Sequence, residues 1–431
     1  MKTKKIIFLY LLLQLSILYT SAQSWQPVGS GLNKYVSEFV VYKNQLYATG
    51  IFEKNGNGDT LNGLAKFNGS DWERVSISAK GGIGPACVFN NKLILGGEIL
   101  CSDGKYSNRI ASWDGTNWNH LGKGLSSSSW SSEMEVYKNE LYVGGAFDSA
   151  GGKKVEYIAR WNDTLWKDVG GGVRYSGFDP PRVNAFLEYN GFLLVGGLFD
   201  WVNSGTLHVD GLVAWDGNQY GKTPGWYGSN LCIFRNRIYS SFGEYLCRMD
   251  STTADYEFAK FSSIKSIEVY NDKLYVGGVG DSIGGIKARN IACWNDTVWE
   301  EVGGGVNDYV SAMIVFDSSL YIGGNFTEAG GRPIMRVARL DLSIKPGVKE
   351  FIHEKPLVQI IPNPTASEIF LKVPPHEQGL FEILDLTGKK VFSKQVRSSV
   401  TIKIEHLPAG LYLYKYSTSS GNASIGKIMK Q

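Results

Sequence analysis

Histidine and cysteine, which most often build metal and redox sites, are scarce in this chain of 431 residues. The five histidines show no metal-ligand spacing, so the sequence indicates no metal site and no cofactor. The glycine runs precede no predicted helix, which argues against a phosphate loop. No catalytic residue can be named from these patterns. The histidines are His120, His208, His353, His376 and His406.

Long apolar runs are absent beyond the amino terminus. Lys2, Lys4 and Lys5 precede an apolar stretch over 6–18, and small residues stand at 20–22. This pattern predicts a secretory signal peptide over 1–22. The run is shorter than the roughly 20 residues that a membrane span requires, so an anchor is the weaker interpretation. We expect no integral membrane segment after cleavage.

An excess of charge of either sign is also missing. Three of the 44 lysines and arginines lie in the signal segment, which leaves 41 basic against 41 acidic residues. A neutral secreted protein has no electrostatic footprint for nucleic acid or an anionic membrane. We therefore exclude nucleic acid as a partner and expect a monomer.

Amphipathic helical patterns are hard to find, whereas glycine accounts for 52 residues and aromatics for 13% of the chain. Aromatic and β-branched runs separated by Gly, Asn and Asp are typical of short antiparallel strands. The sequence therefore predicts an all-β fold. A mature chain of about 409 residues is too large for one simple core, so two domains are expected.

One phrase recurs along the first three quarters of the chain. Residues 141–147 read Leu-Tyr-Val-Gly-Gly-Ala-Phe, with close copies at 274–278 and 320–326 and looser ones at 46–52, 93–97 and 194–199. Neighbouring copies are about 46 to 53 residues apart, near the length of one propeller blade. An apolar run ending in two glycines predicts a buried strand that stops at a turn with positive φ.

Each repeat contains two predicted hairpins. Asn, Asp and Gly in the first turn tolerate the positive φ angles of two-residue hairpins. The second hairpin has tryptophans on both sides of a short turn, as in 158–170, and we interpret these rings as packing between blades. Four antiparallel strands per repeat is the composition of a propeller blade. The first turns are 43–44, 90–91, 138–139, 190–191, 235–236 and 271–272.

The two ends of the repeat array predict a closed ring. The mature chain begins with an orphan strand at 25–29, and the last repeat stops at 336–340 without its outer strand. Pairing these two segments removes open sheet edges. Counting the degenerate repeat at 232–250 gives a seven-bladed β-propeller over 23–342. Six blades is the alternative if that segment is only a connector.

The cysteines Cys87, Cys101, Cys232, Cys247 and Cys293 are interpreted mostly as small buried side chains. The hairpin register places Cys87 opposite Ile94 or Leu95, too far from Cys101 for a disulfide. A bond between Cys232 and Cys247 is not favoured.

The glycine pair followed by a tryptophan strand resembles kelch-type and galactose-oxidase-like propellers, over roughly 25–341. This resemblance implies the fold, whereas propellers host both binding proteins and enzymes.

After a proline-containing linker at 343–356, residues 357–431 show the alternation of a small β-sandwich of about seven strands, resembling an immunoglobulin-like domain. The module resembles the type A carboxyl-terminal sorting domain of the Bacteroidota type IX secretion system. This resemblance implies export across the outer membrane, with the type IX machinery as a partner, to a secreted or cell-surface location. The motif residues are Pro362, Asn363, Pro364, Asp385, Gly388, Gly410, Tyr412 and Lys427.

Loops that join the blades bring aromatic residues to one predicted face. We predict that this face stacks sugars or grips a protein partner, which makes the chain a binding protein. The same rings could instead cap the channel. A secreted carbohydrate- or peptide-active enzyme is the alternative, which a cluster of carboxylates with raised proton affinity at the channel mouth would favour. The predicted ligand-binding residues are Tyr35, Trp130, Tyr175, Phe178, Trp201 and Tyr309.

Overall fold

The computed structural model describes residues 23–126, 131–223, 228–249, 254–342, 358–361, 365–373, 378–385, 389–418 and 423–430. The predicted signal peptide and linker lie outside these residues. The chain divides into two units, Met1–Lys345 and Pro346–Gln431. Apart from one 3-10 turn, η1(Asn203–Gly205), the regular elements of the described residues are all strands. The all-β prediction is therefore confirmed.

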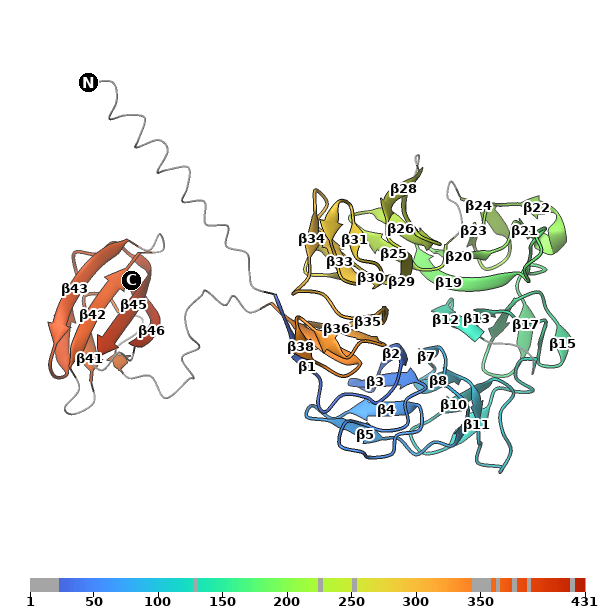
Figure 1. The fold of residues 1–431 in the computed structure, drawn as a ribbon, viewed down its shortest axis with the longest axis horizontal. Helices are drawn as coiled ribbons and strands as arrows, with labels where there is room; N and C mark the ends of the chain where they lie inside the picture. Colours follow the sequence, from blue (N-terminus) through green and yellow to red (C-terminus); the bar gives the residue numbers. More distant parts are fainter. Residues whose placement is uncertain are drawn as a thin grey trace, which may run out of the picture. The chain divides into compact units, whose positions relative to one another are not determined.

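The described residues of the first unit contain seven four-stranded antiparallel sheets. Their innermost strands, β2, β7, β12, β19, β25, β29 and β35, contact one another in this order, and β35 contacts β2 again. The sheets therefore form a closed ring, which Figure 1 shows around a common centre.

The order of the strands from the centre outward fixes which residues face the middle of the ring. From the inner to the outer strand, the sheets are β2(Val36–Tyr42), β3(Gln45–Gly50), β4(Leu64–Phe67), β5(Trp72–Arg74); β7(Ala86–Phe89), β8(Lys92–Gly96), β10(Ile110–Trp113), β11(Trp118–His120); β12(Ser131–Tyr137), β13(Glu140–Gly145), β16(Ile158–Trp161), β17(Trp166–Asp168); β19(Arg182–Tyr189), β20(Phe192–Leu198), β23(Leu212–Trp215), β24(Tyr220–Lys222); β25(Leu231–Phe234), β26(Arg237–Phe242), β27(Tyr245–Met249), β28(Ala254–Lys260); β29(Ser263–Tyr270), β30(Lys273–Val279), β33(Ile291–Trp294), β34(Trp299–Glu301); and β35(Val310–Phe316), β36(Ser319–Gly324), β39(Val337–Asp341), β1(Ser24–Pro27). Short strands in the connections are β6(Ala79–Lys80), β9(Glu98–Ile99), β14(Ser149–Ala150), β15(Lys153–Lys154), β18(Val173–Arg174), β21(Trp201–Val202), β22(Leu207–His208), β31(Ser282–Ile283), β32(Ile286–Lys287), β37(Glu328–Ala329) and β38(Arg332–Pro333).

The two ends of the array pair in the last sheet. Strand β1 runs antiparallel to β39, with Trp25 opposite Leu340 and Gln26 opposite Arg339. Trp25 and Leu340 are both buried in the same apolar cluster. The predicted pairing of 25–29 with 336–340 is therefore confirmed, and it closes the ring.

The inner hairpin turns have positive φ at both central residues, as predicted. Lys138 and Asn139, for example, have φ angles of 48° and 58°. The triple-glycine segments also form turns with positive φ, since Gly303, Gly304 and Gly305 have φ angles of 55°, 81° and 65°. Both kinds of turn use a conformation that glycine and asparagine adopt at low cost.

The prediction of a positive-φ turn is wrong for the glycine pairs other than 96–97, where Gly97 has a φ of 153°. Gly277 and Gly278 lie inside strand β30 without positive φ. A Cβ atom on Gly277 would stand 2.8 Å from Val310 of the next sheet, and one on Gly278 would stand 1.9 Å from the carbonyl oxygen of Ser263. The pair is therefore required for close approach of neighbouring backbone and side chains, and not for a turn.

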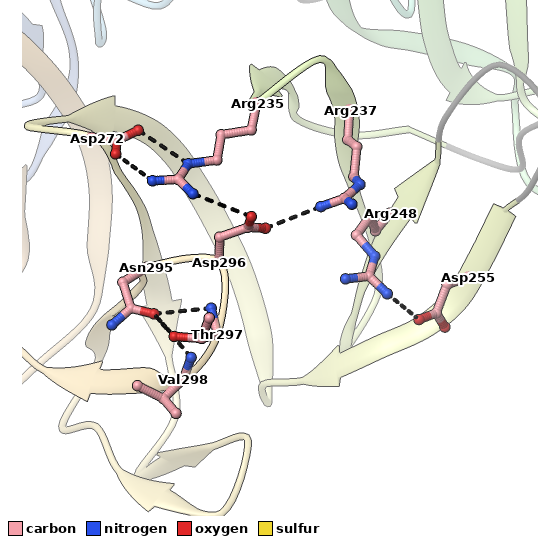
Figure 2. Close-up of polar contacts among 9 residues, drawn as sticks. All are labelled: Arg235, Arg237, Arg248, Asp255, Asp272, Asn295, Asp296, Thr297 and Val298. Atoms are coloured by element: carbon pink, nitrogen blue, oxygen red, sulfur yellow. Dashed lines mark hydrogen bonds and ion pairs between the residues drawn. The ribbon is translucent and has the colours of Figure 1, made fainter.

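The degenerate repeat forms its own sheet, β25 to β28, rather than a connector. Ion pairs join it to the following sheet, as Figure 2 shows: Arg235 binds Asp272 and Asp296, and Arg237 Nη1 lies 3.0 Å from Asp296 Oδ1. None of the five cysteines forms a disulfide, and Cys87 lies opposite Ile94 as predicted. The Cys232–Cys247 disulfide, which we did not favour, is not formed.

The second unit contains seven described strands in two sheets. One sheet has the order β40-β41-β44 and the other β43-β42-β45-β46. Ile369, Phe381, Ile402 and Tyr416 from both sheets share one buried apolar cluster. The strands are β40(Gln359–Ile361), β41(Glu368–Lys372), β42(Gly379–Leu384), β43(Lys390–Val396), β44(Val400–Lys403), β45(Gly410–Thr418) and β46(Ala423–Lys430).

Candidate functional site

Five of the seven inner strands carry a β-bulge near their start. In β2 the register shifts between Val36 and Glu38, and the same shift recurs in β12, β19, β29 and β35. A bulge leaves one residue unpaired and re-aims its side chain. The five bulge residues are Ser37, Ser132, Asn184, Lys265 and Ser311.

All five bulge residues line one cavity of about 380 Å³ at the centre of the ring. A second cavity of about 490 Å³ shares part of this lining. Both volumes lie in the range of small-molecule sites. Hydroxyl and amide side chains are six of the 13 lining residues of the larger cavity and seven of the 17 of the central one, which suits a ligand rich in hydroxyl groups. The shared residues are Ser132, Asn184, Ser229, Asn230 and Lys265.

Two carboxyl groups also border the central cavity. Glu38 Oε2 accepts a hydrogen bond of 2.9 Å from the Ala86 backbone N–H. Burial raises the pKa of Glu38 well above its ordinary value, and the nearby Glu133 charge raises it further. Burial likewise raises the pKa of Glu133 to about 8, with a smaller contribution from Glu135 and opposition from the Met134 N–H. The enclosed walls therefore favour the neutral acids.

Burial also disfavours negative charge at a second set of equivalent positions on the inner strands. Burial raises the pKa of Glu135 and of Glu268, which occupy equivalent positions on β12 and β29. The thiols of Cys87 and Cys232 take the corresponding positions on β7 and β25, and burial raises the pKa of Cys232 to about 12. Such thiols are inert side chains rather than nucleophiles.

Of the predicted aromatic residues, Tyr35 and Tyr309 come together. Their ring centroids are 5.6 Å apart at an interplanar angle of 52°, and both side chains are half-buried. Each lies two residues before a bulge residue, Ser37 or Ser311. The pair is therefore positioned by the strands that line the central cavity.

Tyr175, Phe178 and Trp201 form a second group. Ser176 donates its backbone N–H to Asp200 over 2.9 Å, which ties the loop of Tyr175 to the strand of Trp201. The Trp201 ring meets His208 edge-on at 4.9 Å, and Phe178 is fully exposed. No ring contact joins this group to the tyrosine pair within the described part of the chain. Trp130 lies outside the described residues.

The sorting-motif residues are described in part. Asp385 Oδ1 accepts the Lys389 backbone N–H over 3.0 Å, and Tyr412 donates its hydroxyl to the Pro408 carbonyl over 2.9 Å. Gly410 pairs with Lys430, while Lys427 is exposed on β46. Pro362, Asn363, Pro364 and Gly388 lie outside the described residues.

Metal-ligating clusters and membrane-spanning helices are not found in the described ranges. No group of three or more His, Cys, Asp and Glu side chains there could hold a metal ion. No described helix is long and apolar enough to cross a membrane.

Sequence reasoning missed the lining of the cavities. In the five bulged strands, counting back five residues from the aromatic residue before the inner turn gives the bulge position, as from Tyr42 to Ser37 or from Tyr270 to Lys265. This five-residue spacing is the sequence feature from which the cavity lining could have been predicted.

Comparison with known proteins identifies the class of the carboxyl-terminal module. Residues 359–431 match the family described as the secretion system C-terminal sorting domain. The module is thus a sorting domain of type IX secretion, and the chain is a protein exported to the cell surface or the medium. This confirms the predicted localisation. No curated protein matches the chain.

Several solved structures are similar at low identity. The extracellular domain of a one-component system from B. thetaiotaomicron has 11% identity and a TM-score of 0.47, with 95% of this chain covering 59% of that one. PorZ, a surface component of the type IX secretion system of Porphyromonas gingivalis, has 11% identity and a TM-score of 0.36, with coverages of 91% and 69%. An α-L-arabinofuranosidase from Clostridium thermocellum has 10% identity and a TM-score of 0.26, with coverages of 85% and 95%. Likenesses at this level leave the function open.

Proposed function

We propose that this protein is a secreted or surface-displayed binding protein, built as a seven-bladed kelch-like β-propeller over 23–342. Residues 1–22 serve as its signal peptide, 343–356 as a linker, and 357–431 as an immunoglobulin-like sorting sandwich that engages the type IX machinery. The observation that carries the binding role is the convergence of five bulge residues on one polar cavity. Bulges are features that re-aim side chains at sites, and in this ring they present hydroxyls and amides.

The ligand of this proposed site is a glycan or a protein segment that enters the cavity from the channel mouth. The half-buried Tyr35–Tyr309 pair supports this role, because the accessible part of an aromatic ring can stack on sugars and apolar side chains. A separate candidate contact surface comprises the loop that carries Tyr175 and Phe178 and the strand that carries Trp201.

The test is a glycan array and a protein-partner screen with the mature protein, compared with Ser132→Phe. Ser132 is exposed and borders both cavities, so the larger ring fills the site. Ser282→Phe, an exposed position on β31, is the matched control. We expect binding that is lost in the first variant and kept in the second. Failure of every ligand, or equal binding by both variants, overturns the proposal.

The second candidate is a carbohydrate- or peptide-active enzyme, favoured by the raised pKa of Glu38 and Glu133 beside the central cavity. A carboxylic acid that stays protonated near neutral pH can act as a general acid. If this candidate holds, Glu133→Gln abolishes turnover of the bound oligosaccharide or peptide and leaves its binding intact.

A further inference from the structure

The cavity of about 490 Å³ is lined by three consecutive sheets, β19 to β24, β25 to β28, and β29 to β34, together with Ser132. Two of its lining residues are charged, Arg182 and Lys265, and both are cationic. No aspartate or glutamate is among the described residues that line it. The cavity thus differs from the central one, whose walls include Glu38 and Glu133.

Neither cation of this cavity has an acidic partner among the described residues. Arg182 and Lys265 are exposed, and they form no ion pair or side-chain hydrogen bond with a described residue. The arginines of the neighbouring sheet contrast with them: Arg235, Arg237 and Arg248 are each paired with an aspartate (Figure 2). Two unpaired charges of one sign in a concave site raise the local concentration of counter-ions, so an anionic ligand is favoured.

The polar groups beside the cations suit hydroxyl-rich ligands. Asn230 donates its side-chain amide to Ser241 Oγ over 2.7 Å, which fixes the amide at the wall. Asn184 and Ser229 are half-buried. The distance from Asn184 Nδ2 to Ser229 Oγ is 3.5 Å, and this long contact leaves both side chains able to form further hydrogen bonds. Phe242 adds an aromatic ring with 41% of its surface exposed, on which the apolar face of a sugar can stack.

The repeat is most degenerate at this wall. Ser240 and Ser241 replace the glycine pair, and Phe242 follows them. The connection from β26 to β27 is only residues 243–244, whereas the equivalent connection in the third sheet spans 146–157 and carries the hairpin β14–β15. Departures from a repeated pattern are expected at functional sites, because there the requirements of ligand binding override the residue pattern that the fold favours.

We propose that this cavity binds an oligosaccharide that carries a carboxylate, of the uronic-acid type. The carboxylate binds Arg182 and Lys265, the hydroxyls bind Asn184, Ser229 and Asn230, and the sugar ring packs on Phe242. Guanidinium and ammonium groups form charge-assisted hydrogen bonds with carboxylates, which are stronger than neutral ones. The inference rests on the proposed binding function and names the chemical class of its ligand.

The test is calorimetry on the mature protein with four probes: an oligogalacturonate, a neutral galacto-oligosaccharide of the same length, a sulfated disaccharide, and a peptide with a free terminal carboxylate. We expect the oligogalacturonate to bind at least about tenfold more tightly than the neutral sugar and to weaken with added salt. Arg182→Gln and Lys265→Gln each reduce its affinity about tenfold or more, and Lys287→Gln, on the exposed hairpin β31–β32, leaves it unchanged.

Equal affinity for the neutral sugar, or unchanged affinity in Arg182→Gln and Lys265→Gln, overturns the acidic class but leaves the propeller as a binder. Preference for the sulfated disaccharide or for the peptide reassigns the anion and also overturns the proposal. Absence of all glycan and protein binding defeats the proposed function itself. Thermal unfolding of each variant is the folding control. A melting temperature equal to that of the wild type shows that lost affinity does not reflect lost folding.

Discussion

The indole nitrogen of Trp25 donates a hydrogen bond of 3.2 Å to the carbonyl oxygen of Val302, 277 residues later in the chain. The same contact recurs in four other sheets, so that an aromatic residue in five of the seven outer strands donates to a carbonyl just after the outer strand of the preceding sheet. The closing sheet therefore docks like the others, which makes the junction of the chain ends equivalent to an ordinary sheet boundary. The further pairs are Trp72–Val28, Trp118–Ser76, Trp166–Leu121 and Tyr220–Val169.

Trp25→Ala should lower the free energy of unfolding by about 3–5 kcal/mol, because it removes a fully buried ring and leaves a cavity. Trp25→Phe keeps most of the volume and should cost less, although it leaves the Val302 carbonyl without its donor. Urea unfolding of the mature protein followed by fluorescence measures both. A loss below about 1 kcal/mol for Trp25→Ala contradicts the packing at the closure.

Gly278→Ala should destabilise the first unit by about 3 kcal/mol, at the upper end of the cost of overpacking. The added Cβ would stand 1.9 Å from the Ser263 carbonyl oxygen, so the backbone must shift. Gly221→Ala is the matched control, since that Cβ meets nothing within 4 Å and φ is not positive. The control should leave the melting temperature unchanged or raise it slightly. Equal effects of the two substitutions would contradict the assigned role of the glycine pairs.

Stability should fall between pH 5 and pH 9 because of Glu133. Its pKa is raised to about 8 in the folded state from a value of 4.5. The bound proton therefore stabilises the folded state fully below the lower value, and this stabilisation is lost as the pH rises through the upper one. Glu133→Gln cannot ionise, so its melting temperature at pH 9 should exceed that of the wild type by about 2 °C or more. Glu257→Gln, exposed on β28, should follow the wild-type curve.

Asp296→Ala should weaken the attachment of the degenerate sheet. Its carboxylate binds both Arg235 and Arg237, which come from β25–β26 and their turn (Figure 2). Partly exposed ion pairs contribute little singly, so we expect a loss of about 1 kcal/mol. Hydrogen exchange should increase in β25 to β28 more than in the opposite sheet β2 to β5. A uniform increase around the ring would argue against a local role.

Deletion of 359–431 should prevent the propeller from reaching the cell surface or the medium, because the sorting domain is lost. Immunoblots of cell fractions and medium measure this, and a reporter fused to the linker and sorting domain provides the converse test. Normal export of the truncated chain would show that another segment directs it.

Much of the fold could be predicted from the repeat, because the residues of each hairpin and its turn favour that hairpin locally. Asn139, for example, tolerates the positive φ that its hairpin turn requires. The pairing of β1 with β39 followed from a missing strand at one end and a spare one at the other. The glycine pair led to a wrong prediction, because strand packing at Gly278 and turn geometry both demand glycine, and the chain sequence does not distinguish them.

The candidate site was largely beyond sequence reasoning. Arg182 and Lys265 lie in different repeats, and only the ring brings them to one cavity. Whether Lys265 faces the centre depends on a one-residue register shift, which a bulge creates without a distinctive residue type. The sequence analysis selected large aromatic residues as the binding residues, whereas smaller polar residues line the cavities in the structure.

The pairing of β1 with β39 also constrains how the molecule is made. Among the propeller strands, β1 is synthesised first and β39 last. Strand β1 can therefore pair only after almost the whole ring has been synthesised. Contacts between such distant segments slow folding. A nascent chain interrupted anywhere before Val337 keeps an open sheet edge, so only chains that extend through β39 complete the circle.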